Sequence, residues 1–120
     1  MAHGEITHVE LPSDDLDRAQ RFYSELFGWK MQQTPEMPDY AMFQSGPGES
    51  GGAIGLRGQT APDKLRIYVE VDSLDPIVAR TLELGGSVSV EITDVPGMGR
   101  YAAIVDPEGN EIGLWESLPA

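Results

Sequence analysis

The chain has 120 residues, of which 40% are hydrophobic, with 14 Gly and 9 Pro. This length and composition predict one globular domain, residues 1–120, with a single core and many turns. Its net charge of −12 argues against nucleic acid and anionic membranes as partners. Its lack of cysteine excludes disulfides and thiolate chemistry. No apolar run approaches the roughly 20 residues that cross a bilayer, and no signal peptide is recognisable, so we expect a cytoplasmic location.

The first half of the chain alternates strand and helix signals. Residues 5–11 (EITHVEL) are typical of a strand, and a helix is predicted over residues 13–28 with Ser13 or Asp14 as its N-cap. The helix ends at Gly28 and has one apolar face, formed by Leu16, Ala19, Tyr23 and Leu26. Short strands follow at residues 29–34, 40–45 and 52–57. The glycine-rich segment 46–52 lacks the residues of a phosphate loop and is predicted to join two strands.

The second half repeats the first at a constant offset of 58 residues. A strand is predicted at residues 65–71, a helix at 73–84, and strands at 87–93, 99–105 and 110–116. Ile54, Gly55 and Leu56 reappear as residues 112–114, and matches of this kind gather at strand starts, helix ends and turns. We therefore predict an α+β fold of two tandem βαβββ modules, about residues 4–58 and 64–116. The modules are expected to form a curved, partly open mixed sheet around a cavity, with the helices outside.

Strand alternation assigns side chains to the two faces of the predicted sheet. Positions such as Val9 and Leu11 should face a helix, and their neighbours should face the cavity. The predicted cavity-facing residues, which are the candidate ligand-binding set, are His8, Glu10, Gly55, Arg57, Arg66, Tyr68, Glu70, Gly113 and Trp115.

Three segments carry a resemblance to a known family. They are THVELPSDDLDRAQRFYSELFGW, VEVDSLD leading into LELGG, and DPEGNEIGLWE. Together they resemble the vicinal oxygen chelate superfamily, which includes glyoxalase I, bleomycin and fosfomycin resistance proteins and extradiol dioxygenases. The resemblance covers essentially the whole chain and implies a homodimer.

The resemblance also implies a metal site, which this sequence does not support. The four positions that hold the metal in relatives look like His8, Gly55, Arg66 and Gly113 here. Only His8 can ligate a metal, since glycine has no ligating side chain and arginine is a permanent cation. We therefore expect no metal ion and no other cofactor. The two glycines either leave room for the body of a ligand or simply allow the sheet to bend.

Each candidate residue has two interpretations. His8 is a general base or hydrogen-bond donor, or else a histidine held by Glu10. Arg66 clamps an anionic or carbonyl group of a ligand, or else closes a salt bridge with Glu10 or Glu70. Tyr68 and Trp115 stack on a flat or cationic molecule, or else form a subunit contact.

The favoured function is binding of a small organic molecule, cationic or aromatic, without a metal. The alternative is a metal-independent isomerase, cyclase or epimerase with His8 and Arg66 as the catalytic residues. A metal-dependent glyoxalase-like lyase or dioxygenase is the third and weakest hypothesis.

Overall fold

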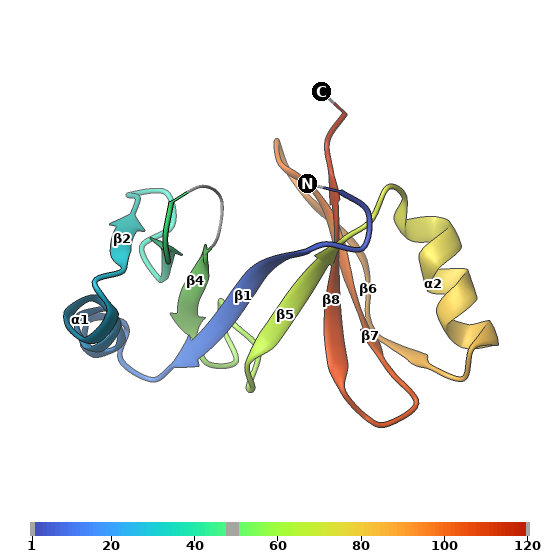
Figure 1. The fold of residues 1–120 in the computed structure, drawn as a ribbon, viewed down its shortest axis with the longest axis horizontal. Coiled ribbons are helices and arrows are strands. Elements are labelled where there is room, and N and C mark those ends of the chain that lie inside the picture. Colours follow the sequence, from blue (N-terminus) through green and yellow to red (C-terminus); the bar gives the residue numbers. More distant parts are fainter. Residues whose placement is uncertain (1, 48–50, 120) are drawn as a thin grey trace. The chain divides into compact units, whose positions relative to one another are not determined.

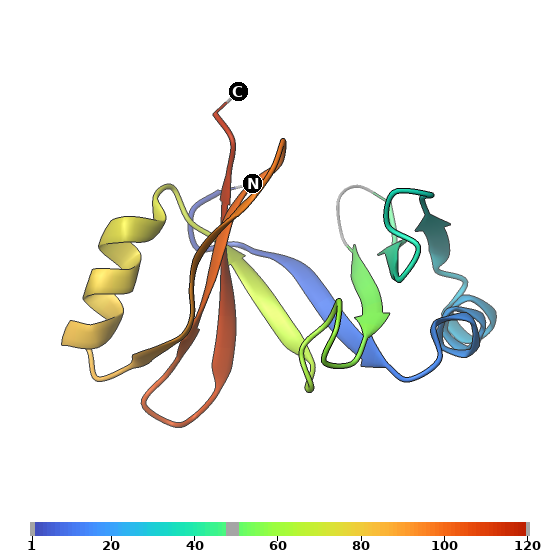
Figure 2. The ribbon, with the colours of Figure 1, turned by 180° about the vertical axis from the view of Figure 1, so that it is seen from behind.

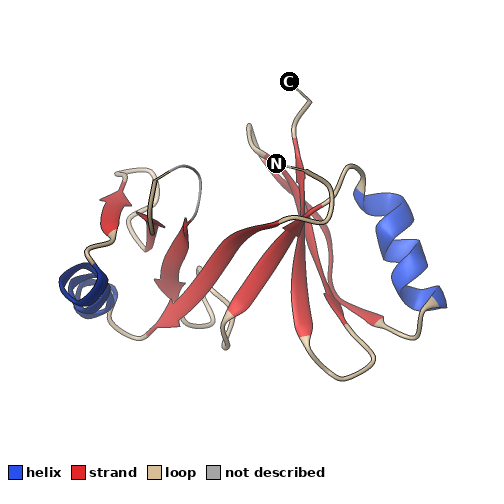
Figure 3. Cartoon of the chain, in the orientation of Figure 1, coloured by secondary structure: helices blue, strands red, loops and turns tan. Residues whose placement is uncertain are grey.

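The computed structural model describes residues 2–47 and 51–119, which contain two helices and eight strands (Figures 1 and 3). The chain divides into an N-terminal unit, residues 7–66, and a C-terminal unit, residues 67–119 together with residues 2–6. The first module contains β1 (Ile6–Ser13), α1 (Leu16–Phe27), β2 (Lys30–Gln33), β3 (Tyr40–Gln44) and β4 (Gly51–Leu56). The second contains β5 (Arg66–Glu70), α2 (Leu74–Glu83), β6 (Ser87–Val95), β7 (Gly99–Val105) and β8 (Glu111–Ser117). Residues 48–50 of the predicted loop lie outside the described residues.

The sheet of the N-terminal unit has the strand order β2-β3-β4-β1. β1 and β4 are parallel, with Leu11 opposite Ile54, and the other pairs are antiparallel. Helix α1 packs on one face of this sheet, where Leu11, Phe43 and Ile54 form the buried core (Figure 1). Alternation along β1 therefore sends His8 and Glu10 to the opposite face.

Two predictions for α1 are wrong in detail. Its N-cap is Asp15 and not Ser13 or Asp14, because the Asp15 carboxylate accepts a hydrogen bond from the Arg18 backbone N–H at 3.0 Å. Leu26, which the periodic pattern assigned to the apolar face of the helix, is 59% exposed and does not join the core. A stack of aromatic rings completes the core instead: Tyr23 lies 5.3 Å from Trp29, and Trp29 lies 4.5 Å from Phe43.

The sheet of the C-terminal unit repeats this arrangement in the order β5-β8-β7-β6 (Figure 2). β5 and β8 are parallel, and Val71, Leu74, Ala102 and Leu114 form the core beneath α2. Residues 2–6 belong to this unit because they bond to the end of β5. The Gly4 N–H donates to the Glu70 carbonyl at 2.7 Å, and the Glu70 N–H donates to the Glu5 carbonyl at 2.8 Å.

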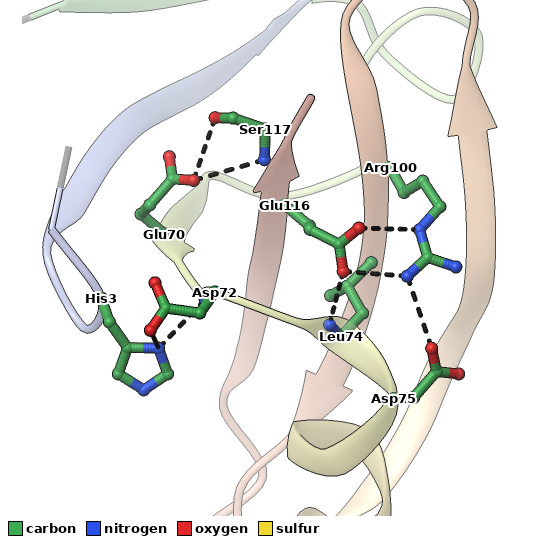
Figure 4. Close-up of polar contacts among 8 residues, drawn as sticks. All are labelled: His3, Glu70, Asp72, Leu74, Asp75, Arg100, Glu116 and Ser117. Atoms are coloured by element: carbon green, nitrogen blue, oxygen red, sulfur yellow. Dashed lines mark hydrogen bonds and ion pairs between the residues drawn. The ribbon is translucent and has the colours of Figure 1, made fainter. Parts of the chain in front are cut away.

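Helix α2 is capped from a distance. Ser73 occupies the N-cap position but makes no side-chain capping bond. Instead, Glu116 of β8 accepts a hydrogen bond from the Leu74 backbone N–H at 2.7 Å (Figure 4). Arg100 holds the same carboxylate through two bonds of 2.8 and 3.0 Å. The hydrogen bonds from Arg100 and Leu74 lower the pKa of Glu116, which favours the charged form that caps the helix.

The predicted α+β class with two βαβββ modules is confirmed. The helices begin 58 residues apart, at Leu16 and Leu74. The register of the two parallel pairs differs, however. Gly55 is opposite Pro12, so an exact repeat would put Glu70 opposite Gly113. Gly113 is instead opposite Tyr68, two residues earlier in β5. A shift of two residues keeps every side chain on its face of the sheet, so the core pattern survives. Neither helix in the described residues is long and apolar enough to cross a membrane.

Candidate functional site

His8, Glu10 and Tyr40 form one hydrogen-bonded group on the face of the N-terminal sheet opposite α1, here called the helix-free face. The Tyr40 hydroxyl donates to Oε2 of Glu10 at 2.6 Å and lies 3.2 Å from Nε2 of His8. Nε2 of His8 is 4.0 Å from Oε2 of Glu10. The side chains of His8 and Glu10 are only 25% and 11% exposed. The structure therefore joins two of the predicted site residues through a third that the sequence analysis did not select.

Small residues in β4 make this group possible. Tyr40 belongs to β3, and β4 lies between β3 and β1, so the Tyr40 side chain must cross β4 to reach His8 and Glu10. On that face β4 has Gly55, opposite Tyr40, and Ala53, opposite Glu10. Ala53 is completely buried. The alternation of YAMFQ, with Ala41 and Phe43 in the core, is the signal by which Tyr40 could have been assigned to this face.

Burial controls the protonation of His8. Removal of the imidazole from water lowers the pKa of His8, and the negative charge of Glu10 opposes this shift only in part. His8 is therefore neutral at pH 7, with one protonated and one unprotonated ring nitrogen. A neutral imidazole beside a hydroxyl and a carboxylate can donate and accept hydrogen bonds, and it can take up a proton from a bound molecule.

The structure shows what lies next to the two equivalent glycines. A Cβ at Gly113 would lie 2.5 Å from ring atoms of Tyr68, and a Cβ at Gly55 would lie 2.8 Å from the Ala61 Cβ and the Thr60 carbonyl oxygen. Contacts that short are not tolerated between carbon atoms. The chain itself therefore fills the space beside each glycine, with an aromatic ring in the C-terminal unit and with the segment after β4 in the N-terminal unit.

Aromatic side chains gather on the face of the C-terminal sheet opposite α2, which is the helix-free face of that unit. Tyr68 and Tyr101 meet edge to face, with ring centroids 6.5 Å apart. Tyr101 is opposite Trp115 in the β7–β8 pair, and Trp115 is opposite Glu70 in the β5–β8 pair. Trp115 is two residues beyond Gly113 in β8, so both positions are on the same face of the sheet. The ring of Tyr68 lies over Gly113. Tyr101, which the sequence analysis did not select, is the ring that contacts Tyr68.

Two charged candidates are engaged within their own unit. Oε2 of Glu70 accepts hydrogen bonds from the backbone N–H and the hydroxyl of Ser117, at 3.3 and 2.9 Å (Figure 4). The Trp115 indole N–H in turn donates to the Ser117 hydroxyl at 3.1 Å. Arg57 donates to the Asp14 carboxylate at 3.0 Å and to the Asp63 carbonyl at 2.6 Å. These contacts give Glu70 and Arg57 structural roles at the ends of β8 and β4.

The residues present do not fit the metal site of the superfamily. No group of three or more His, Cys, Asp or Glu side chains able to hold an ion occurs within residues 2–47 and 51–119. Of the four positions matched by resemblance, only His8 carries a ligating atom, and its Nε2 is already beside the Tyr40 hydroxyl. Arg66, at the start of β5, is 8% exposed and has no lone pair to offer a metal.

Known proteins resemble this chain in sequence and in fold. The family model for the bleomycin resistance protein-like N-terminal region matches residues 5–46. CFP32 of Mycobacterium tuberculosis is 30% identical over 115 residues, which cover 91% of this chain and 44% of CFP32. The lactoylglutathione lyase of Haemophilus influenzae is 30% identical over 125 residues, covering 94% of this chain and 93% of the lyase. The chain thus spans less than half the length of CFP32 but nearly all of the lyase.

Solved structures give the same fold. A glyoxalase/bleomycin resistance protein/dioxygenase superfamily member from Vibrio splendidus superposes with a TM-score of 0.67 at 12% identity, covering 92% of this chain and 97% of that one. Methylmalonyl-CoA epimerase from Mycobacterium tuberculosis superposes with a TM-score of 0.67 at 18% identity, covering 99% and 93%. The chain belongs to the vicinal oxygen chelate superfamily. Within it, the paired βαβββ modules are those of the glyoxalase and bleomycin resistance proteins.

Proposed function

We propose that this protein binds a small organic molecule without a metal ion, on the helix-free face of its N-terminal sheet. The observation that carries the proposal is the His8–Glu10–Tyr40 group. At the position where relatives place a metal ligand, this chain has an imidazole bonded to a tyrosine hydroxyl, which suits hydrogen bonding to an organic ligand. The rings of Tyr68, Tyr101 and Trp115 offer surface on which an aromatic or cationic molecule could stack.

A thermal-shift screen tests binding directly. The panel contains aromatic cations, neutral aromatic molecules of the same size, and dicarbonyl compounds. A ligand that prefers the native state raises the melting temperature, by an amount that grows with the ratio of its free concentration to its dissociation constant. We expect a hit whose effect is lost in His8→Gln but kept in Gln33→Ala, which alters an exposed residue of β2. A hit that stabilises both variants equally would contradict a role for His8.

The second candidate function is a metal-independent proton-transfer enzyme, such as an isomerase, cyclase or epimerase. The neutral state of His8 favours it, because a base must be unprotonated at working pH. Incubation of each screening hit in D2O with the protein tests this hypothesis by mass spectrometry. Deuterium uptake at an acidic C–H of the ligand would establish catalysis if the uptake disappears in His8→Gln. Binding without deuterium uptake would contradict the enzyme hypothesis and favour the binding function.

A metal-dependent lyase or dioxygenase is the weakest alternative. Titration with Ni²⁺, Co²⁺ and Mn²⁺, followed by calorimetry, measures any metal site directly. We expect no stoichiometric binding, because typical catalytic sites use about three protein ligands and His8 supplies one. Tight binding of one ion per chain, lost in His8→Gln, would restore this alternative.

A homodimer and a cytoplasmic location belong to the same proposal. Superfamily resemblance supports the dimer, and light scattering coupled to gel filtration measures it as a mass of twice 13.1 kDa. A single chain mass over a wide concentration range would refute the dimer. Imaging of the tagged protein in its host tests the location.

A further inference from the structure

Helix α1 carries an exposed strip with an apolar centre. Phe22 and Leu26 lie one turn apart on the helix and are 56% and 59% exposed. Arg18 and Glu25 are exposed on the same side of the helix, four residues before Phe22 and three residues after it. These four residues are here called the α1 strip. An aromatic centre with a polar rim is the usual pattern of a protein interface.

The Phe22 ring is supported from behind by other rings. It meets the Tyr23 ring edge to face with centroids 5.2 Å apart, and Tyr23 stacks on Trp29 at 5.3 Å. Trp29 in turn stacks on the buried Phe43 ring at 4.5 Å. A row of rings therefore connects the α1 strip to the core. A side chain held in this way loses less conformational freedom when a partner covers it.

The equivalent helix of the second module has no such strip. Arg80 of α2 occupies the position of Phe22, 58 residues further along the chain, and its guanidinium lies 3.8 Å from the Glu83 carboxylate. Charged pairs of this kind are typical of a helix face that contacts water. The repeated fold therefore does not require the exposed phenylalanine of α1.

The charges around the α1 strip favour a second copy of the chain as its partner. The chain has a net charge of −12, whereas the segment 15–30 is neutral. Its three acids are Asp15, Asp17 and Glu25, and its three bases are Arg18, Arg21 and Lys30. Two copies therefore repel each other least through this surface. Arg18 and Glu25 form no ion pair within residues 2–47 and 51–119, so both can pair with a partner.

We propose that two copies of the chain associate through antiparallel α1 helices about a two-fold axis next to Phe22. Positions 18 and 25 lie on opposite sides of position 22, so this symmetry brings Arg18 of each copy to Glu25 of the other. The two Phe22 rings meet at the axis. A parallel arrangement would instead place like charges together. The inference rests on the homodimer of the proposed function and assigns its contact surface to α1.

Sedimentation equilibrium over a wide range of concentration measures the dissociation constant of the dimer. Phe22→Arg gives α1 the residue that α2 has at the equivalent position, where it can pair with Glu25 as Arg80 does with Glu83. The variant should therefore fold, and its dissociation constant should rise roughly tenfold or more, as on loss of a central anchor. Leu84→Arg is the matched control, at a residue that is 61% exposed at the end of α2, and should leave the constant unchanged.

Charge reversal tests the antiparallel arrangement. Arg18→Glu should place two acids together across the interface, and Glu25→Arg two bases, so each change should weaken the dimer. The two changes shift the net charge in opposite directions, so a general charge effect cannot explain weakening by both. The double variant Arg18→Glu with Glu25→Arg should restore wild-type association. Each change also agrees with the helix dipole and should not impair folding.

The inference is overturned if Phe22→Arg dimerises as strongly as the wild type, or if the double reversal is as weak as the single ones. In either case the homodimer itself stands, and its subunits meet in another way. A wild-type chain that is monomeric at every concentration refutes both the homodimer and its contact surface. Ligand binding is measured separately by the thermal-shift screen.

Discussion

Gly113 is the residue at which a single methyl group has the largest expected effect. The ring of Tyr68 would lie 2.5 Å from a Cβ at this position, so Gly113→Ala forces the ring or β8 to move. Overpacking of this kind costs about 1–3 kcal/mol. Urea unfolding should show that loss for Gly113→Ala, and a change within about 0.5 kcal/mol for Gly46→Ala, whose position has no neighbour within 4 Å.

The double variant separates the contact from a general effect of the backbone. Replacement of Tyr68 by alanine removes all the ring atoms that collide with the added methyl group. Gly113→Ala with Tyr68→Ala should therefore be less destabilising than the sum of the two single changes. If the changes in unfolding free energy of the two single variants simply add up in the double variant, contact with the Tyr68 ring is not the reason that position 113 requires glycine.

His8 gives the folded protein a defined response to pH. Burial holds its pKa below the ordinary value of about 6.5 that applies in the unfolded chain. As the pH falls through 6.5, the unfolded chain therefore takes up a proton before the folded one does, and stability declines until the folded pKa is passed. The contribution of His8 is complete above pH 6.5 or so.

A variant isolates this response from that of the carboxylates. In His8→Gln the side chain does not titrate, so the free energy of unfolding should fall less between pH 7.5 and 5.5 than in the wild type. The measurement is urea unfolding at both pH values, with the difference between the two proteins as the result. Equal losses in both proteins would contradict burial of a neutral His8.

At the scale of the elements, the two helices are capped in different ways. Asp15 caps α1 locally, whereas Glu116 caps α2 from β8 and Ser73 makes no capping bond. Loss of a capping side chain typically costs ~1 kcal/mol. Urea unfolding should show that cost for Asp15→Ala and at least as much for Glu116→Ala, which also removes the partner of Arg100, but little change for Ser73→Ala. A large loss in Ser73→Ala would contradict the remote cap.

Local patterns predicted the elements because the information for them is local. Period-two and period-3.6 patterns place every strand and helix, and Gly28 ends α1 in the left-handed conformation with φ of 75°. The cap of α2 could not be predicted in this way, since Glu116 and Leu74 are 42 residues apart in sequence. For the same reason, His8 and Glu10 could be placed on one face, but their link through Tyr40 depends on strand order and on Ala53.

At the scale of the whole molecule, the two modules have the same order of elements, but equivalent elements differ in length. β2 has four residues and its counterpart β6 has nine. The offset of 58 therefore holds at the helix starts but not at every strand. A core needs only the correct face of each strand, so lengths can drift while alternation persists. This is why a fold could be derived from the repeat, whereas the pairing register could not.

Charge is divided unequally between the two units. The C-terminal unit contains 11 of the 20 acidic residues but only Arg80 and Arg100 of the eight basic ones, a net charge of −9 against −3 for the N-terminal unit. Like charges at this density repel one another and destabilise the folded state. The repulsion acts across solvent, so dissolved salt should weaken it.

Salt should therefore stabilise the protein. Raising NaCl from about 0.01 M to about 0.15 M shortens the screening length from ~30 Å to ~8 Å. The melting temperature at pH 7.5 should rise by a few degrees, since ~1 kcal/mol corresponds to about 4 °C in a domain of this size. Asp94→Asn combined with Glu108→Gln, two exposed acids of the C-terminal unit, should raise the low-salt melting temperature and reduce the gain from salt. A melting temperature that falls with salt would mean that attractive pairs such as Arg100 with Glu116 outweigh the excess of negative charge.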